Sequence, residues 1–335
     1  MQVTAKAPCR VDLAGGTLDI WPLYLYHANA VTLNFAVSVY TTCRITAREG
    51  SAITLRSADQ QVEETYDRLE TLESAKRHRH ALAAQVVKHF RPQGGLVVET
   101  DSESPQGAGI AGSSSMLIST VSAFNRYLKT GHGIEQVREI AQNIEAQVIR
   151  VPTGCQDYYP AMYGGVGAVE LTVAGIRRKA LPVDAAELNR RFVLAYTGKP
   201  RQSGINNWEV TKLHIDGSKA VEKNFARIAE IAHAMRGALE KGDWAETARL
   251  LRAEWDHRRK NAPGITTETL DRLVAVSRKA GAQAAKVCGA GGGGCAVFLC
   301  EQEARARVAA ALEREGARVL HVQVAPKGVT VKSAG

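Results

Sequence analysis

The 335-residue sequence lacks the patterns that mark membrane-bound and exported chains. It contains no run of about 18 apolar residues, the length needed to cross a bilayer. Its first ten residues, MQVTAKAPCR, contain no apolar core of the kind found in signal peptides. These absences predict a cytoplasmic chain with no membrane partner.

Cysteine and histidine are sparse and scattered. The six cysteines include no C-x-x-C pair, and the nine histidines include no H-E-x-x-H. Zinc ligands usually occur at such short spacings, so a protein-held zinc site is not expected. The same scatter favours reduced, buried thiols over disulfides.

Basic residues are in excess, but they form no long runs interleaved with aromatic residues. The formal net charge of +9 suits an anionic small substrate as well as a nucleic acid. The densest basic cluster, KRHRH at 76–80, is interpreted as a solvated helix surface, with a phosphate contact as the alternative. We therefore predict no nucleic-acid partner.

The hydrophobic content of 45% and charged content of 23% are typical of globular proteins, and the length allows two domains. Alternating or continuous apolar residues predict strands over 3–13, 31–45, 53–55, 96–100, 192–196, 295–300 and 318–324, and a pair within 166–181. Apolar residues spaced by three and four predict helices over 82–90, 116–128, 133–149, 221–239, 244–255, 266–280 and 303–315. The order lacks regular β/α alternation, so we predict an α+β fold with domains at 1–185 and 186–335.

A glycine- and serine-rich stretch, GAGIAGSSS at 107–115, precedes the helix predicted at 116–128. Its small residues leave backbone amides uncovered, and its serines lie at a helix start, where the dipole favours anions. These features indicate a phosphate cradle between the strand predicted over 96–100 and the helix predicted over 116–128. A flexible loop with a good helix cap is the alternative. The stretch is not a Walker A motif, because no Lys follows it, nor a dinucleotide-binding G-x-G-x-x-G motif.

Charged residues near these glycines are candidates for chemistry. Arg10 and Asp12 fall on one face of the first strand, because strand side chains alternate. Asp19 is a candidate acceptor of hydroxyl hydrogens from a polyol, or a turn cap. Asp157, within TGCQDYYPAMYGG, is a candidate positioned carboxylate, or a turn-stabilising residue. Helical spacing alone indicates that Glu145 is a surface residue.

Three separated motifs resemble those of the GHMP small-molecule kinases. APCRVDLAGGTLD resembles the family's first motif, SPQGAGIAGSSSM its phosphate-binding motif, and KVCGAGGGGCAVF its third, in family order from about residue 5 to 300. Within the family, LAGGTLD, QDYYPAMYGG, YTGKPRQS and GAGGGG are most similar to sugar kinases, especially the D-glycero-D-manno-heptose 7-phosphate kinases. Galactokinase, fucokinase and glucuronokinase types are the alternatives.

The resemblance implies a fold and an activity. The fold would combine an N-terminal domain like part of a small-subunit ribosomal protein with a ferredoxin-like C-terminal domain, and ATP and magnesium would bind between them. The implied activity is ATP-dependent transfer to a sugar hydroxyl, the anomeric hydroxyl of D-glycero-D-manno-heptose 7-phosphate. Alternatives are a kinase of unphosphorylated galactose, fucose or glucuronate, or a non-catalytic sugar- and ATP-binding sensor. We expect a small-molecule sugar or sugar-phosphate partner, and a monomer or homodimer.

The resemblance also implies roles for individual residues. Asp157 matches the acid at the acceptor hydroxyl, and Arg10 matches the basic residue beside that acid. Glu145 and either Ser114 or Ser115 match the magnesium ligands. The serine is undecided because GAGIAGSSS is one residue longer than the family pattern. The nucleotide phosphates would be bound by Gly107, Ala108, Gly109, Ile110, Ala111, Gly112, Ser113, Ser114 and Ser115. The acceptor would be bound by Gly15, Gly16, Thr17, Asp19, Gly289, Gly291 and Gly292, with Lys199 and Arg201 for a second phosphate.

Overall fold

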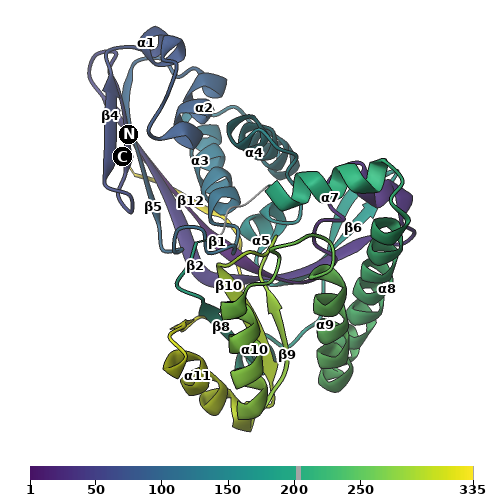
Figure 1. The fold of residues 1–335 in the computed structure, drawn as a ribbon. Helices are drawn as coiled ribbons and strands as arrows, with labels where there is room; N and C mark the ends of the chain where they lie inside the picture. Colours follow the sequence, from purple (N-terminus) through teal and green to yellow (C-terminus); the bar gives the residue numbers. More distant parts are fainter. Residues whose placement is uncertain (201–204, 335) are drawn as a thin grey trace.

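The computed structural model describes residues 1–200 and 205–334, arranged around two β-sheets with helices packed on them (Figure 1). The larger sheet has the strand order β12-β1-β2-β5-β3-β4, with β6 paired to β2 and β7 to β6. All of these pairs are antiparallel except β3 with β5. The strands are β1 (Gln2–Ala14), β2 (Val31–Arg48), β3 (Ile53–Ser57), β4 (Val62–Tyr66), β5 (Gly95–Ser102), β6 (Val166–Thr172), β7 (Gly175–Ala180) and β12 (Thr330–Ala334).

Helix α3 (Gly112–Leu128) is the central helix of this part and packs on β1 and β2. Every residue over 114–124 is buried, because the sheet covers one side of the helix and other helices cover the rest. The start of α3 is therefore rigidly placed. Its neighbours are η1 (Leu23–Tyr26), α1 (Leu69–Ser74), α2 (Ala81–Phe90), α4 (Ile134–Ile149) and α5 (Tyr158–Tyr163).

The smaller sheet is antiparallel, with the strand order β11-β8-β10-β9. Its strands are β8 (Phe192–Tyr196), β9 (Ala282–Val287), β10 (Cys295–Cys300) and β11 (Arg318–Leu320). Figure 1 shows α10 and α11 side by side next to this sheet, and α8 and α9 as a second pair. The helices of this part are α6 (Ala185–Arg191), α7 (Ile205–Ile215), α8 (Lys219–Lys241), α9 (Trp244–Arg258), α10 (Glu268–Ala280), η2 (Gln302–Ala304) and α11 (Arg305–Arg314).

The structure confirms the α+β architecture, and the sequence pattern located most of the long elements but missed α7. The predictions over 192–196 and 295–300 coincide with β8 and β10. Three predictions need correction: the aromatic loop after Asp157 contains α5, the strand predicted over 318–324 ends at Leu320, and the helix predicted over 303–315 begins with the 3-10 turn η2. The pattern missed short elements, such as β4 and β12, because their residues are largely exposed and show no clear apolar period.

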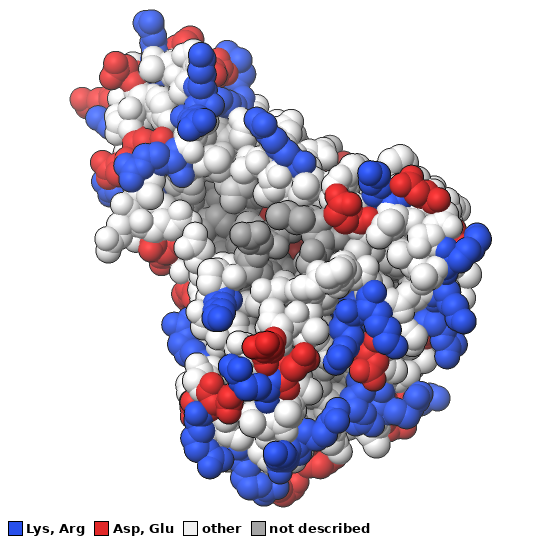
Figure 2. All heavy atoms as spheres, viewed as in Figure 1, with Lys and Arg blue, Asp and Glu red and all other residues white. Residues whose placement is uncertain are grey.

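The cysteines match the prediction of buried thiols. All six are buried, and none of them forms a disulfide. In the described part of the chain, no helix combines the length and the apolar character needed to cross a bilayer. Figure 2 shows Lys and Arg side chains intermixed with Asp and Glu over this face of the molecule.

Candidate active site

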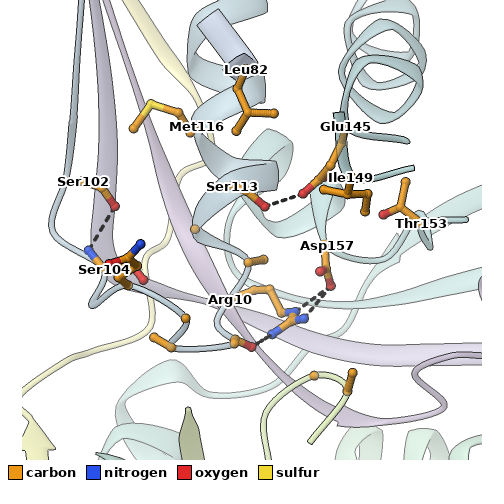
Figure 3. Close-up of a pocket in the computed structure, with 18 of the residues that line it drawn as sticks. Arg10, Leu82, Ser102, Ser104, Ser113, Met116, Glu145, Ile149, Thr153 and Asp157 are labelled. Carbon is orange, nitrogen blue, oxygen red and sulfur yellow. Dashed lines mark hydrogen bonds and ion pairs between the residues drawn. The ribbon is translucent and has the colours of Figure 1, made fainter. Parts of the chain in front are cut away.

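A cavity of about 440 Å³ brings together most of the residues that the motifs single out. One end is lined by the 104–113 segment and the first turn of α2 (Figure 3). The other end is lined by β1, the turn after it and the end of α9. The lining includes Arg10, Thr17, Asp19, Gly107, Ala108, Gly109, Ala111, Gly112, Ser113, Glu145, Asp157 and Gly289. Segments from both halves of the chain therefore form one site.

The 107–112 segment has a backbone suited to an anion. Gly107, Gly109 and Ala111 have left-handed φ angles of 65°, 73° and 61°. Alternating left-handed residues turn successive N–H groups toward one concave side. Ala111 is the residue before α3 and has no side-chain capping bond, so the amides of the first helical turn are available to a ligand.

Glu145 closes one side of this concavity, facing the start of α3 (Figure 3). Ser113 donates to its Oε1, while the Ser114 Oγ and the Tyr158 hydroxyl donate to its Oε2 at 2.8 and 2.5 Å. The sequence indication of a surface residue is wrong, since Glu145 is only 5% exposed. Burial raises the pKa of Glu145, and the three hydroxyl donors oppose that rise.

The Ser115 hydroxyl points away from the cavity. It lies 3.0 Å from the Ala7 carbonyl oxygen and 2.8 Å from the Thr41 Oγ1, and Ser115 is fully buried. A metal at Glu145 would therefore meet the hydroxyls of Ser113 and Ser114. Of the two serines assigned from the sequence, Ser114 contacts Glu145, whereas the Ser115 hydroxyl contacts Ala7 and Thr41.

Arg10 and Asp157 form an ion pair on the cavity wall (Figure 3). The Arg10 Nε and Nη2 lie 2.9 and 2.6 Å from the Asp157 Oδ1, and the Arg10 Nη1 donates to the Gly109 carbonyl at 2.7 Å. Burial opposes the charge of Arg10, but Asp157 and Asp12 outweigh it and raise the pKa of Arg10. One buried guanidinium therefore links the carboxylate before α5 to the glycine segment.

Asp12 lies beside Arg10, as the strand alternation predicts, but makes its strongest contacts with the other half of the chain. The Lys286 Nζ lies 2.5 Å from the Asp12 Oδ2, and the Gly289 amide donates to Oδ1 at 2.8 Å. Burial favours the neutral form of Asp12, but Lys286, Arg10 and Arg258 hold its pKa well below the usual range. Asp12 thus fixes the second glycine-rich segment against β1.

The turn after β1 is held by polar contacts. Asp19 is 3% exposed, its Oδ2 accepts the Gln156 backbone amide at 2.8 Å, and burial raises its pKa to about 6. Arg258, from the end of α9, donates to the Gly16 carbonyl at 2.9 Å and to the Thr17 Oγ1 at 3.3 Å. Gly15 has a φ of +82°, and a Cβ there would lie 2.0 Å from the Val31 carbonyl oxygen.

The second glycine-rich segment contributes Gly289 and Ala290 to the cavity. Gly291 and Gly292 pack instead against the 264–265 turn, where a Cβ on Gly291 would lie 2.6 Å from the Ile265 carbonyl oxygen. A Cβ on Gly294 would lie 2.6 Å from the Ala108 carbonyl oxygen, so the two glycine-rich segments touch backbone to backbone.

Of the two cations predicted for a second phosphate, Lys199 is not part of the described cavity lining. Lys199 is exposed, and its backbone carbonyl accepts the Gly294 amide at 3.0 Å. Arg201 lies outside the described residues.

Sequence reasoning missed several lining residues because they carry no motif. Leu82, Met116 and Ile149 form an apolar end of the cavity (Figure 3). Gln156, Asn207 and Arg258 line the end near the β1 turn. The basic cluster at 76–80 lies in the loop between α1 and α2 rather than on a helix, and its Arg79 and His80 line the cavity.

The oxygen donors at Glu145 fit a hard cation better than a zinc ion. Among the described residues there is no group of three or more His, Cys, Asp and Glu side chains placed to hold a metal. Magnesium is typically bound through one or two carboxylates together with substrate phosphates and waters. One buried carboxylate and two hydroxyls beside an amide-lined concavity meet that requirement.

Comparison with known proteins identifies the family. The model described as GHMP kinases N terminal domain matches residues 77–165, and the model described as GHMP kinases C terminal matches residues 235–318. The chain belongs to the GHMP kinases. As a GHMP kinase it is a phosphotransferase with an alcohol group as acceptor, and it has the family's two-domain fold.

Relatives align over nearly the whole GHMP kinase chain. A D-glycero-alpha-D-manno-heptose 7-phosphate kinase of Campylobacter jejuni is 27% identical over 336 residues, covering 98% of each chain. The structure of a D-glycero-D-manno-heptose 1-phosphate kinase from Bacteroides thetaiotaomicron has a TM-score of 0.79 at 24% identity, covering 99% of each chain. Lactococcus lactis galactokinase, solved with galactose, has a TM-score of 0.81 at 19% identity, covering 98% of this chain and 95% of its own.

Proposed function

We propose that this GHMP kinase transfers the γ-phosphoryl group of ATP to the anomeric hydroxyl of D-glycero-D-manno-heptose 7-phosphate. The observation that carries the proposal is the Arg10–Asp157 pair beside the amide-lined start of α3, with Glu145 opposite. A carboxylate for the acceptor, a fixed cation and an anion cradle are the parts that phosphoryl transfer requires.

The nucleotide would bind at the end of the cavity that includes α2 and α3. Its phosphates would accept hydrogen bonds from the 107–114 backbone, and its base would pack against Leu82, Met116 and Ile149. Glu145, Ser113 and Ser114 would hold magnesium, which neutralises charge on the phosphates when it is bound.

Asp157 and Arg10 would perform the chemistry at the acceptor. Asp157 would orient the attacking hydroxyl and accept its proton, a general-base role worth about 10² to 10⁴ in rate. Arg10 would keep Asp157 ionised and stabilise the charge of the phosphoryl group in transit, since a guanidinium stays protonated in proteins. The hydrogen bond from Arg10 to the Gly109 carbonyl would hold the Arg10 side chain beside the phosphate cradle.

The charges of the acceptor end bear on where a phosphorylated sugar would lie. Among the described residues that line this end, the acids are Asp19 and Asp157, and the basic side chains are Arg10 and Arg258. Arg258 is also paired with the buried Glu254. A second phosphate would therefore be placed away from the reacting hydroxyl, toward the rim. Lys199 and Arg201 are our candidates there, and a kinase of an unphosphorylated sugar is the second candidate function.

A panel of acceptors tests the proposal. ADP release would be measured with heptose 7-phosphate, galactose, fucose, glucuronate and mevalonate, and the phosphorus NMR spectrum would identify the phosphorylated carbon. We expect the highest kcat/KM with heptose 7-phosphate and a product phosphorylated at C1. A preference for an unphosphorylated sugar would replace the substrate assignment. Measurable sugar binding without ADP release from any sugar would instead favour a sensor.

We also propose residues 1–185 and 186–335 as the two domains. The proposal is supported by the separate sheets, with β12 returning from the second domain to pair with β1. The cavity would then close between the domains around both substrates.

A further inference from the structure

Gln156 stands directly before Asp157 on the cavity wall and has no role in the chemistry described above. Its side chain is only 5% exposed, yet it lines the cavity. Its backbone amide donates to Asp19, which fixes the residue between the two carboxylates of the acceptor end. Gln156 is therefore held at the cavity wall by its main chain.

The Gln156 side-chain amide is incompletely hydrogen-bonded. Its Oε1 is buried and has no hydrogen-bond partner among the described residues. Leaving a buried polar atom unpaired destabilises the folded state, so native proteins rarely leave one without a use. Because this atom belongs to a residue of the cavity wall, a ligand in the cavity is the simplest partner for it.

The surroundings of the amide define the chemistry of that partner. A Cβ on Gly16 would lie 2.7 Å from the Gln156 Nε2, 3.1 Å from the Asp12 Oδ2 and 3.4 Å from an Arg258 nitrogen. The amide thus packs on a bare glycine between a paired carboxylate and a paired guanidinium. An amide both donates and accepts, as a hydroxyl does, and it adds no charge to a region that already contains Asp12 and Asp19.

We propose that the side-chain amide of Gln156 is a specificity-determining group that hydrogen-bonds the acceptor hydroxyl next to the one that reacts at Asp157. This inference rests on the proposed function. For transfer to an anomeric hydroxyl, the neighbour is the hydroxyl on C2 of the sugar. The amide then selects polyhydroxylated acceptors over acceptors that lack this hydroxyl, because such an analogue leaves the buried amide unpaired.

The test compares a sugar with its 2-deoxy analogue in wild type and in Gln156→Met, which keeps the size of the side chain and removes its hydrogen bonds. Heptose 7-phosphate and 2-deoxyheptose 7-phosphate are the probes. If the panel shows a preference for an unphosphorylated sugar, galactose and 2-deoxygalactose replace them. We expect wild type to prefer the parent sugar at least tenfold in kcat/KM, and Gln156→Met to reduce that preference to below threefold.

A purely structural role would give a different pattern. Gln156→Met is expected to raise the acceptor KM about tenfold or more with little change in the KM for ATP, since the nucleotide binds at the other end of the cavity. Gln156→Glu provides a second variant of the same shape, and it should also raise the acceptor KM because it adds a charge beside Asp12 and Asp19. Loss of activity that affects both sugars equally would indicate misplacement of Asp157 and overturn the inference.

Gln283 provides a matched control. It lies on β9 outside the cavity lining, and its Oε1 is likewise buried without a partner among the described residues. Gln283→Met should leave the preference for the 2-hydroxyl unchanged. Full retention of that preference in Gln156→Met would refute the inference while leaving the kinase assignment standing. Absence of wild-type turnover with every sugar would remove the proposed function, and the inference with it.

Discussion

The Lys286 Nζ lies 2.5 Å from the Asp12 Oδ2, and both side chains are completely buried. This pair joins β9 to β1 at the point where the two halves of the chain face the cavity. Buried ion pairs are costly to break from one side, because the remaining charge has no water to solvate it. Keeping this pair intact is therefore needed for stability, and the pair also fixes β9 against β1.

Replacing Lys286 by Met should lower the free energy of unfolding by about 3–5 kcal/mol, because Asp12 is left buried without its cation. Denaturant titration followed by circular dichroism measures this change. Replacing both residues, as in Asp12→Leu with Lys286→Met, should recover part of the loss. Arg56→Met is the control, because Arg56 pairs with Glu63 and Glu99 at the surface, where water solvates the charges left behind. Equal effects of Lys286→Met and Arg56→Met would contradict the expectation.

Replacing Asp157 by Asn should lower kcat by about 10² to 10⁴ and leave ATP affinity nearly unchanged, because the amide cannot accept the proton of the acceptor hydroxyl. Steady-state kinetics and titration with a fluorescent ATP analogue measure the two quantities separately. Asp184→Asn is a control, since Asp184 caps α6 outside the cavity lining. Undiminished turnover by Asp157→Asn would exclude Asp157 as the base.

The three consecutive serines should separate into two classes. Ser113→Ala and Ser114→Ala are expected to raise the magnesium concentration needed for half-maximal activity, because both hydroxyls contact Glu145. Ser115→Ala should leave that concentration unchanged but lower stability by about 1–3 kcal/mol, because its buried partners, the Ala7 carbonyl and Thr41, lose a hydrogen bond. Magnesium titrations of activity and thermal unfolding distinguish the two effects. A magnesium effect confined to Ser115→Ala would reverse the assignment.

A histidine pair should make stability depend on pH. The Nε2 atoms of His27 and His214 lie 2.8 Å apart, so at least one ring must be neutral. Burial and the neighbouring His214 lower the pKa of His27 to about 4, below the value of about 6.5 in unfolded chains. The unfolded state then binds more protons over this interval, so stability is greatest above about pH 6.5 and falls toward pH 4.

The variant His27→Gln should flatten this dependence between pH 7 and pH 5. The melting temperature across that range measures it, with His233→Gln, on α8, as the control. Glu222 opposes the effect by raising the pKa of both histidines. An unchanged slope in His27→Gln would show that other groups cause the loss of stability in acid.

The sequence predicts best what a short segment encodes by itself. Arg10 and Asp12 share a face because strand residues alternate. The 107–115 segment leads into α3, which begins at Gly112, four residues earlier than the sequence pattern predicts. The prediction that Glu145 is exposed was wrong because the spacing of residues on α4 does not indicate which elements cover the helix. Its partners at 113–114 and 158 come from other elements.

The rest of the site depends on contacts between distant residues. Arg258 reaches the Gly16 carbonyl from 242 positions away, and nothing near it in the sequence distinguishes it from a solvated arginine. Lys286 offers a weak signal, since it is the one charge within the AQAAKVC run that forms β9 and its end. A lysine in such a run needs a buried anion, but only the fold identifies Asp12 as that partner.

The irregular pairing of β1 with β2 has an evolutionary consequence. The register shifts between Pro8 and Cys9, just before the residues that face the cavity. Inserting or deleting one residue between that shift and Arg10 would turn Arg10 and Asp12 to the opposite face of the sheet. Insertions and deletions between the register shift and Arg10 should therefore be absent from active variants that evolve from this sequence. The exposed turn between β6 and β7, where Gly175 has open space beside it, should tolerate them.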